Sequence, residues 1–299
     1  MKPSRKTIII AVFLTFFAIT ALIVFLFRPA VLIVTELSFY ELYGANRLRS
    51  ETVRSSLVLF RRVIPVAVAD EAGDDIIQAA VEGASSRPLC VLFPLRFAMV
   101  AHNYREKNPD VPVVLLEGRY TEEENPAAFA ISGNMEDYFI YKTDISIDFY
   151  RAGLAAAILD GEKNERLAVL LESGIQKPAK EAFSKALNDA GKSLQTSFFT
   201  TYSQFTGNKN VSCVVLTGNG IDYFENYSDI PVVFFTWINP ELIPQDVVLV
   251  FNDSPWVQAV ASVRMVEAGM KKGQIPSKIL FTGKKTIDKN TVRKLRKIL

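Results

Sequence analysis

The side chains most often used in catalysis and metal binding are scarce in this chain of 299 residues, which holds one histidine and two cysteines. A zinc site built from His102, Cys90 and Cys213 would leave most of the ligand set to carboxylates. Both cysteines lie in apolar runs typical of buried strands, so we expect small buried hydrophobic residues. His102 lies in a helix-like stretch without a nucleophile motif, so we expect an ordinary histidine on a helix face.

Sequence patterns of common enzyme classes are also missing. The chain has no Gly-x-Ser-x-Gly elbow, no phosphate-binding Gly-x4-Gly-Lys-[Ser/Thr] loop and no His-Glu-x-x-His pair. A carboxylate pair brought together by the fold is the alternative that the sequence leaves open. We therefore predict a protein that is not an enzyme, with no catalytic residue, cofactor or metal.

Charge is unevenly distributed along the chain. The net charge of +2 combines Lys2, Arg5 and Lys6 and a strongly basic stretch at 284–299 with an acidic body at 28–283. An acidic body argues against nucleic acid as a partner. The basic stretch is either a solvated last helix or a contact to anionic lipid headgroups.

An apolar run without a charge occupies residues 7–27 and is long enough to cross a hydrocarbon core. Its length and the lack of an Ala-x-Ala site favour an uncleaved signal anchor over a cleaved signal peptide. Basic residues gather before the run, so the positive-inside rule puts the N-terminus in the cytoplasm and the body outside. Residues 1–28 are therefore the predicted transmembrane segment.

Short apolar runs alternate with helix-like stretches through the rest of the chain. The runs are residues 31–35, 63–70, 89–94, 111–118, 139–144, 167–173, 211–218, 231–237, 247–253 and 278–283. Continuous apolar strands between helices are typical of parallel sheets covered on both faces. About ten strands exceed one comfortable sheet, so the predicted fold class is α/β with two Rossmann-like lobes.

Helical spacing is expected directly after the first strand, where apolar residues recur over 42–57. The residues that carry this spacing are Leu42, Ala45, Leu48, Val53 and Leu57. This spacing predicts a helix after the first strand.

Three segments resemble a known family. They are FPLRFAMVAHNYREKNPDVPVVLLEG at 93–118, DISIDFYRAGLAAAIL at 144–159 and RLAVLLESGIQKPAKEAFSKALNDAG at 166–191. Their order is similar to that of the type I periplasmic binding fold, and within it to the basic-membrane-protein family of substrate-binding lipoproteins, which includes nucleoside binders. The resemblance covers residues 31–299.

The resemblance implies two lobes joined by a hinge of several chain crossings. Lobe 1 would hold residues 29–144 and 253–274, and lobe 2 would hold 145–252 and 275–299. Ligands in such folds bind in the cleft between the lobes, just after the strands. The implied function is a membrane-anchored solute-binding protein of the bacterial inner membrane, single-pass, with its body facing the periplasm or the outside. It would deliver a nucleoside-like or sugar-like ligand to an ABC-type permease.

Candidate ligand contacts in lobe 1 follow the strands. Phe39 could stack on a flat ligand or pack on the lobe, and Tyr40 stands where nucleoside-binding relatives carry an asparagine. Phe93 narrows the loop that is glycine-rich in relatives. Arg96 could bind an anionic ligand group or be an exposed arginine at a helix start. Asp144, on the first crossing, could touch ligand or cap the next helix.

Lobe 2 and the second crossing supply the other candidates. Gly174 and Asn219 follow strands, and the helix after Gly174 begins with free N–H groups. Thr236 stands where relatives place an aspartate for a sugar hydroxyl, and Asp253 is the remaining acidic candidate. Trp237 could stack on a ring or plug the cleft. The alternative to ligand binding is a pocket-less interaction or structural protein that keeps the same fold, as the bulky Tyr40, Phe93 and Trp237 allow.

Overall fold

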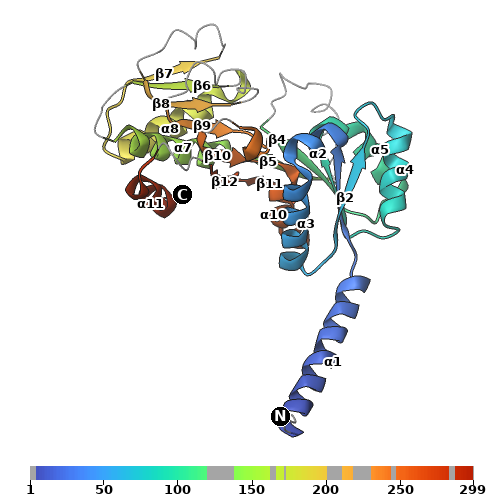
Figure 1. Ribbon diagram of the computed structural model, residues 1–299. Helices are drawn as coiled ribbons and strands as arrows, with labels where there is room; N and C mark the ends of the chain where they lie inside the picture. The colour runs from blue at the N-terminus through green and yellow to red at the C-terminus, as the bar shows by residue number, and fades with distance from the viewer. Residues whose placement is uncertain are drawn as a thin grey trace.

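The computed structural model describes residues 5–119, 138–161, 166–171, 173–200, 211–217, 230–243, 247–282 and 287–298. Within these ranges the chain forms two lobes, each built on a six-stranded sheet with helices on its faces (Figure 1). The predicted α/β fold class is confirmed.

The sheet of lobe 1 is parallel throughout. Its order is β11 (Lys272–Ile275), β5 (Phe139–Thr143), β4 (Val113–Gly118), β3 (Cys90–Pro94), β1 (Val31–Glu36) and β2 (Val63–Val68). The accompanying helices are α2 (Leu37–Tyr43), α3 (Ala45–Leu59), α4 (Asp74–Ala84), the 3-10 turn η1 (Leu95–Phe97), α5 (Ala98–Lys107) and α10 (Pro255–Glu267). Successive residues of β1 face opposite sides, and both sides are buried, which explains its unbroken apolar sequence.

The sheet of lobe 2 has one antiparallel strand. Its order is β12 (Lys278–Phe281), β10 (Val247–Asn252), β9 (Val232–Phe235), β8 (Val211–Leu216), β6 (Arg166–Leu170) and β7 (Thr196–Phe199). Its helices are α7 (Ile145–Asp160), η2 (Ser173–Ile175), α8 (Gln176–Asp189), η4 (Pro240–Leu242) and α11 (Lys289–Ile298). Gly153 of α7 lets α8 approach closely, because a Cβ there would lie 2.7 Å from the Ala186 Cβ.

One strand departs from the expected parallel arrangement, because β12 pairs antiparallel with β10. Only residues 276 and 277 separate β11 from β12, and a parallel connection needs a long crossover. The chain therefore enters lobe 2 beside the carboxyl ends of the other strands. Strand β12 must then run in the direction opposite to theirs. Strands β7 and β11 were not predicted, because both are short edge strands without an apolar run.

The helical stretch expected over 42–57 forms two helices. Gly44 adopts a φ of +89°, which few other residues tolerate, and divides the segment into α2 and α3. Leu48 is buried, whereas Leu42, Val53 and Leu57 are exposed. The turn at Gly44 changes the direction of the chain, so α2 and α3 each bury a different face. Phe39 and Tyr43 are the buried residues of α2.

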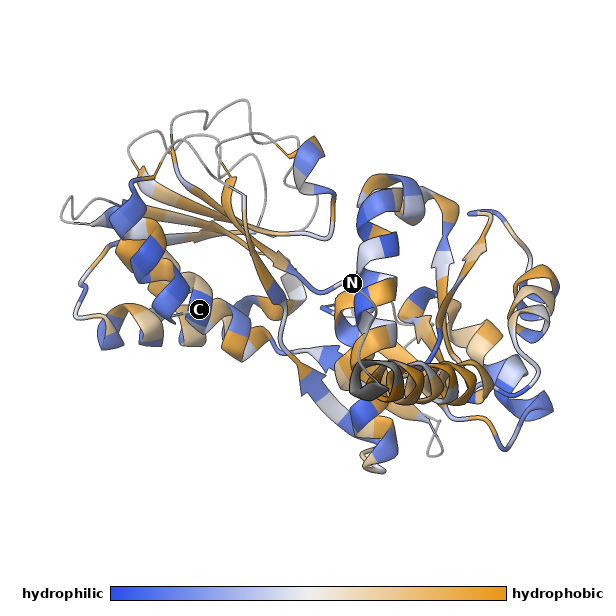
Figure 2. Cartoon of the chain, turned by 60° about the horizontal axis from the view of Figure 1, so that its bottom comes forward, coloured by the Kyte–Doolittle hydropathy of each residue, from blue (hydrophilic) through white to orange (hydrophobic). Residues whose placement is uncertain are grey.

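Helix α1 (Arg5–Phe27) projects from lobe 1 (Figure 1) and, after Arg5 and Lys6, is hydrophobic over most of its length (Figure 2). The 19 residues Ile9–Phe27 have a mean hydropathy of 2.9, and none of them is buried inside the protein. A helix that is apolar on all sides and unburied is suited to a membrane span. This helix is therefore a candidate span by length and composition.

Candidate functional site

The carboxyl ends of both sheets meet where the lobes touch. Three chain segments pass between the lobes within the described residues: after β5, between β10 and α10, and between β11 and β12. Ligand sites of open α/β sheets lie beyond the carboxyl ends of the strands. The candidate site is therefore the interlobe site, defined here by the residues after β1, β4, β5, β9 and β10.

An aromatic contact joins the two lobes at this site. Phe39 of α2 stacks on Tyr43, with ring centroids 5.2 Å apart, and lies 4.5 Å from the ring of Trp237, which follows β9. The Asn239 N–H donates to the Leu42 carbonyl at 2.9 Å. The sequence allowed two roles for Trp237, stacking on a ligand ring or filling the cleft between the lobes. In the structure the Trp237 ring is half-buried against lobe 1.

An ion pair lies on the other side of the site. The Arg119 Nε, directly after β4, is 3.5 Å from Asp253 Oδ2, and its Nη2 donates to the Phe235 carbonyl at 3.4 Å. The Thr143 hydroxyl also donates to Asp253, at 3.1 Å, and Gln258 donates to Thr143 at 3.2 Å. This network connects the ends of β4, β5, β9 and β10, so it couples the two lobes through polar contacts.

Several buried polar groups near the second crossing have no hydrogen-bond partner among the described residues outside their own cluster. They are Tyr43 Oη, Asn252 Nδ2, Ser254 Oγ and Trp256 Nε1. All four residues are at least 99% buried. Burial raises the pKa of the Tyr43 hydroxyl, and the nearby Arg47 and the adjoining side chains of Ser254 and Asn252 oppose that rise. Unsatisfied buried polar groups are rare in native proteins, so this cluster is suited to a polar guest.

A buried carboxylate ties the first and third crossings together. Both oxygens of Asp148, on α7, accept from the Ser277 N–H, at 2.9 and 3.2 Å, and Oδ2 also accepts from the Ser277 hydroxyl. Desolvation raises the pKa of Asp148 to about 7, and its hydrogen bonds with Ser277 limit that rise. Asp144 caps α7 by accepting from the Ile147 N–H at 2.9 Å. Of the two roles expected for Asp144, ligand contact and helix cap, this hydrogen bond supports the helix cap.

The other sequence candidates occupy varied positions. Arg96 forms an ion pair with Glu36, and its guanidinium lies 4.8 Å above the Phe97 ring. Phe93 is fully buried against Tyr104 in the core of lobe 1, and Tyr40 is half-buried on the opposite face of the sheet.

Two lobe 2 candidates also lie in described segments. Thr236 is buried and accepts from the Ile238 N–H at 3.2 Å, and Gly174 lies in η2. Asn219 lies outside the described residues.

Sequence reasoning missed four residues of the interlobe site: Tyr43, Arg119, Asn252 and Ser254. Arg119 directly follows the predicted strand 111–118, and Asn252 ends the strand before Asp253. The rule that candidates follow strands would therefore have found Arg119, whereas Asn252 lies inside the predicted strand 247–253 and escapes that rule. Tyr43 lies one helical turn after Phe39, a spacing that places the two rings on one face.

Both cysteines and the histidine lie where the sequence predicts. Cys90 and Cys213 are buried and form no disulfide, and burial raises both thiol pKa values to about 12. His102 is half-exposed on α5, with Nε2 3.5 Å from Glu106. Within the described ranges, no group of three or more His, Cys, Asp or Glu side chains is arranged to hold a metal ion.

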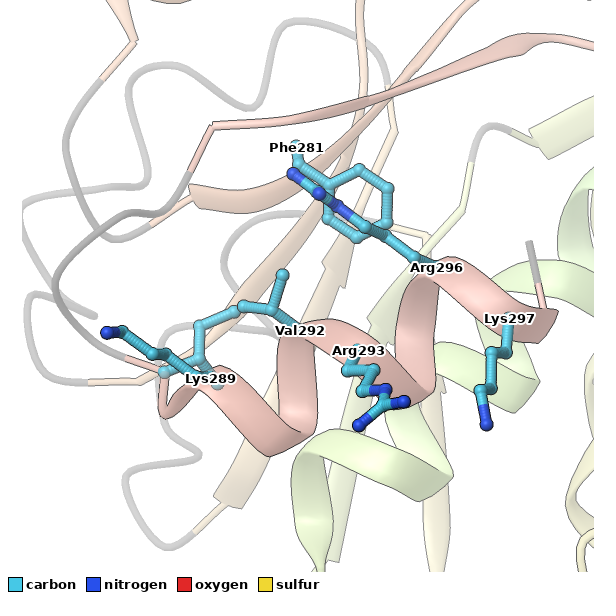
Figure 3. Close-up of a pocket in the computed structure, with 7 residues that line it drawn as sticks. Phe281, Lys289, Val292, Arg293, Arg296 and Lys297 are labelled. Carbon is cyan, nitrogen blue, oxygen red and sulfur yellow. The ribbon is translucent and has the colours of Figure 1, made fainter.

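A separate hollow of about 630 Å³ lies against α11, far along the chain from the interlobe residues (Figure 3). Phe281, Ile287 and Val292 give it an apolar lining, and the Arg296 guanidinium lies 5.5 Å above the Phe281 ring. The cationic ends of Lys289, Arg293 and Lys297 do not converge on one point (Figure 3). Leu295 is fully buried, so α11 packs on lobe 2 as a basic last helix.

Similarity to known proteins is found in the structure and not in the sequence. No protein-family model and no curated relative matches the chain. A periplasmic ABC transporter solute-binding protein of Actinobacillus succinogenes with bound D-allose has 13% identity and a TM-score of 0.53, covering 85% of this chain and 98% of its own.

Two further structures have higher TM-scores. A transcriptional activator of the comK gene from Bacillus halodurans has 13% identity and a TM-score of 0.57, covering 90% of this chain and 95% of its own. An ABC transporter solute-binding protein of Conexibacter woesei has 11% identity and a TM-score of 0.57, covering 90% and 94%. At these identities the likeness shows the fold, and the chain has the periplasmic-binding-protein fold.

Proposed function

We propose that this protein is an extracytoplasmic solute-binding protein that holds a small polar ligand between its two lobes without chemical conversion. The fold supports this function, because its interlobe region is where such folds place ligands. The proposed lobes hold residues 29–144 with 253–274, and residues 145–252 with 275–299. The three crossings would act as the hinge about which the lobes open and close.

The observation that carries the proposal is the cluster of unsatisfied polar groups at Tyr43, Asn252 and Ser254. Each is fully buried or nearly so, and a buried polar group without a partner is costly by about 1–3 kcal/mol. A hydroxyl-rich ligand that enters when the lobes open would supply the missing partners. Satisfying several such groups at once gives both affinity and orientation.

We propose a sugar-like ligand in preference to a nucleoside. The aromatic rings of Phe39 and Trp237 offer flat faces for the C–H surface of a sugar, and Arg119 with Asp253 offers charged partners for hydroxyls. A structural neighbour binds D-allose. The nucleoside pattern is incomplete here, because Tyr40 and Thr236 replace the asparagine and aspartate of nucleoside-binding relatives.

The cellular setting is part of the proposal. Helix α1 would anchor the chain as a single pass in a bacterial inner membrane, with the body outside the cytoplasm. The ligand would pass to an ABC-type permease. Membership of the basic-membrane-protein family is proposed on the three sequence segments that resemble it.

A second function is favoured by a specific contact. Phe39 and Trp237 touch directly across the lobes, and a backbone hydrogen bond joins Asn239 to Leu42. Side chains that fill the cleft are what a pocket-less interaction protein would have. In a solute binder the same contact belongs to the closed state and must open to admit ligand.

Native mass spectrometry of the full-length protein released from detergent micelles, followed by a thermal-shift screen of sugars, nucleosides and amino acids, tests the proposal. We expect a sugar-specific rise in melting temperature that grows with concentration. The Tyr43→Phe variant should bind the same sugar about five- to tenfold more weakly, because it lacks one hydroxyl. Tyr150→Phe, on the exposed surface of α7, is the control and should bind normally. A protein without copurified ligand that ignores every compound would support the pocket-less function.

A further inference from the structure

The edge of lobe 1 opposite the interlobe site is where β1, β2 and β3 begin, and it adjoins α1. Only residues 28–30 separate α1 from β1, so this edge cannot lie far from the end of α1. The Phe25 ring lies 5.7 Å from the Phe60 ring, and the Arg28 guanidinium lies 5.5 Å above the same ring. Figure 1 shows α1 leaving lobe 1 beside the end of α3.

Four arginines surround this exit, and we call Arg28, Arg61, Arg62 and Arg87 with Phe60 the base of lobe 1. The Val31 N–H donates to the Arg62 carbonyl at 2.8 Å, and the Leu89 N–H donates to the Ala30 carbonyl at 2.7 Å. These bonds place the segments that carry Arg62 and Arg87 on either side of the chain as it leaves α1. Both arginines are exposed.

Acidic groups near the base are few. Glu267 forms an ion pair with Arg61 at 3.1 Å, which neutralises one arginine. Asp110 precedes β4, two strands from β1 in the sheet. At the far end of the same edge, Lys271 and Lys272 add positive charge at the start of β11. Around the base, arginines and lysines thus outnumber Glu267 and Asp110, which leaves a positive excess.

Exposed apolar side chains lie beside these arginines at the end of α3. Leu57 is 70% exposed, Val58 is 49% exposed and Phe60 is 40% exposed. Apolar groups next to arginines, on a surface close to a membrane helix, have the composition of an interfacial membrane contact. The apolar groups suit the boundary between headgroups and acyl chains, and the guanidinium groups suit phosphates.

We propose that the base of lobe 1 rests on a bilayer and binds the phosphates of anionic phospholipids through Arg62 and Arg87, with Leu57 and Phe60 inserted at the interface. This inference rests on the membrane anchoring by α1 in the proposed function. The contact would hold lobe 1 against the bilayer with its strands pointing away from it. The interlobe site would then open on the side of lobe 1 away from the lipid, and lobe 2 would be the moving part.

The test uses the full-length protein with a fluorophore on a Leu57→Cys variant, reconstituted in vesicles of phosphatidylcholine with or without 30% phosphatidylglycerol, a proportion on the order of natural anionic surfaces. Nitroxide-labelled lipids quench the fluorophore if it reaches the interface. The native Cys90 and Cys213 are buried and give little background labelling. We expect strong quenching in vesicles with phosphatidylglycerol and weak quenching without it.

The Arg62→Gln/Arg87→Gln double variant should reduce the equilibrium constant for the docked state about 30-fold, since each arginine near an anionic surface contributes roughly 1 kcal/mol. The control is Arg49→Gln/Lys177→Gln, which removes the same charge from exposed positions on α3 and α8. It should leave quenching unchanged.

Three outcomes would overturn the inference. Equal quenching in both vesicle types and in both double variants would mean that the short tether alone brings Leu57 to the lipid. An anchored chain without quenching would mean that the base binds no lipid, and protein partners with acidic surfaces would be sought. A chain that alkaline carbonate extracts from the vesicles would remove the anchoring itself, while sugar binding in the thermal-shift screen would remain a separate result.

Discussion

The buried polar atoms of Tyr43, Asn252 and Ser254 find no partner among the described side chains outside their own cluster. Nearby, Arg119 pairs with Asp253, which also accepts from the Thr143 hydroxyl. In the proposed function, a ligand that supplies hydroxyls would give the cluster its missing partners.

Asp148 gives a pH prediction at the scale of one residue. Desolvation raises its folded-state pKa from 3.8 to about 7, the nearby Asp253 adds to the rise and Arg119 opposes it. The folded protein thus holds a proton that the unfolded chain loses near pH 4. The stability contributed by protonated Asp148 is complete at low pH and is lost as pH rises from about 4 through 7, with an order of magnitude of about 4 kcal/mol.

The Asp148→Asn variant should remove this dependence, because its amide can keep a hydrogen bond with Ser277 and does not ionise. Urea unfolding at pH 5 and pH 8 measures the effect. We expect the variant to gain stability relative to the native protein at pH 8 and to differ little at pH 5. Asp75→Asn, in the exposed first turn of α4, is the control. Parallel pH profiles for Asp148→Asn and the native protein would contradict the assignment.

The positions of single residues after strands could be predicted from the sequence, whereas contacts between residues far apart in the sequence could not. Phe39, Trp237 and Asp253 were identified from their positions after strands, and the structure brings all three to the interlobe region. The Arg119 contact with the Phe235 carbonyl spans 116 positions of sequence, which no local pattern reveals. Side chains alternate between the two faces of β3, and Phe93 points into the core of lobe 1. Predicting that direction requires the strand register.

At the scale of elements, the helices and central strands could be predicted because their apolar patterns are local. Strands such as β1 and β10 are buried on both faces and have unbroken apolar runs. The edge strands β7 and β11 have no such run, and the direction of β12 depends on where the chain crosses between lobes. Local sequence does not specify these features, because tertiary pairing does.

The contact between α7 and α8 gives a prediction at this scale. The Cβ of a Gly153→Ala variant would lie 2.7 Å from the Ala186 Cβ and 2.8 Å from the Phe183 carbonyl oxygen. We expect a loss of about 1–3 kcal/mol in the free energy of unfolding, although alanine favours helices more than glycine does. Gly83→Ala on α4 meets no atom within 4 Å and should be neutral or stabilising.

Thermal and urea unfolding of both glycine variants measures the difference. Close packing of α7 on α8 predicts that Gly153→Ala lowers the free energy of unfolding, whereas Gly83→Ala leaves it unchanged or raises it. A Gly153→Ala protein as stable as the native protein would mean that α7 and α8 pack less tightly than described.

At the scale of the whole molecule, the two lobes differ in their surroundings. Lobe 1 follows α1 directly and carries the basic base, whereas lobe 2 is joined to it by three crossings. Polar contacts at Asp148 and Ser277 and at Asp253 and Thr143 hold the crossings together. In the proposed function, these contacts would persist while the Phe39–Trp237 contact opens, and closure would be a motion of lobe 2 about the crossings.

Ligand titration followed by tryptophan fluorescence tests the central claim of sugar binding between the lobes most directly. The chain holds two tryptophans, and comparison with the Trp237→Phe variant, which keeps an aromatic ring at the lobe contact, gives the part of the emission that comes from Trp237. We predict a saturable change in Trp237 emission with one class of sugar and a weaker affinity when Tyr43→Phe is added. Unchanged Trp237 emission with every sugar, in a protein whose near-ultraviolet circular dichroism shows it to be folded, would contradict the claim.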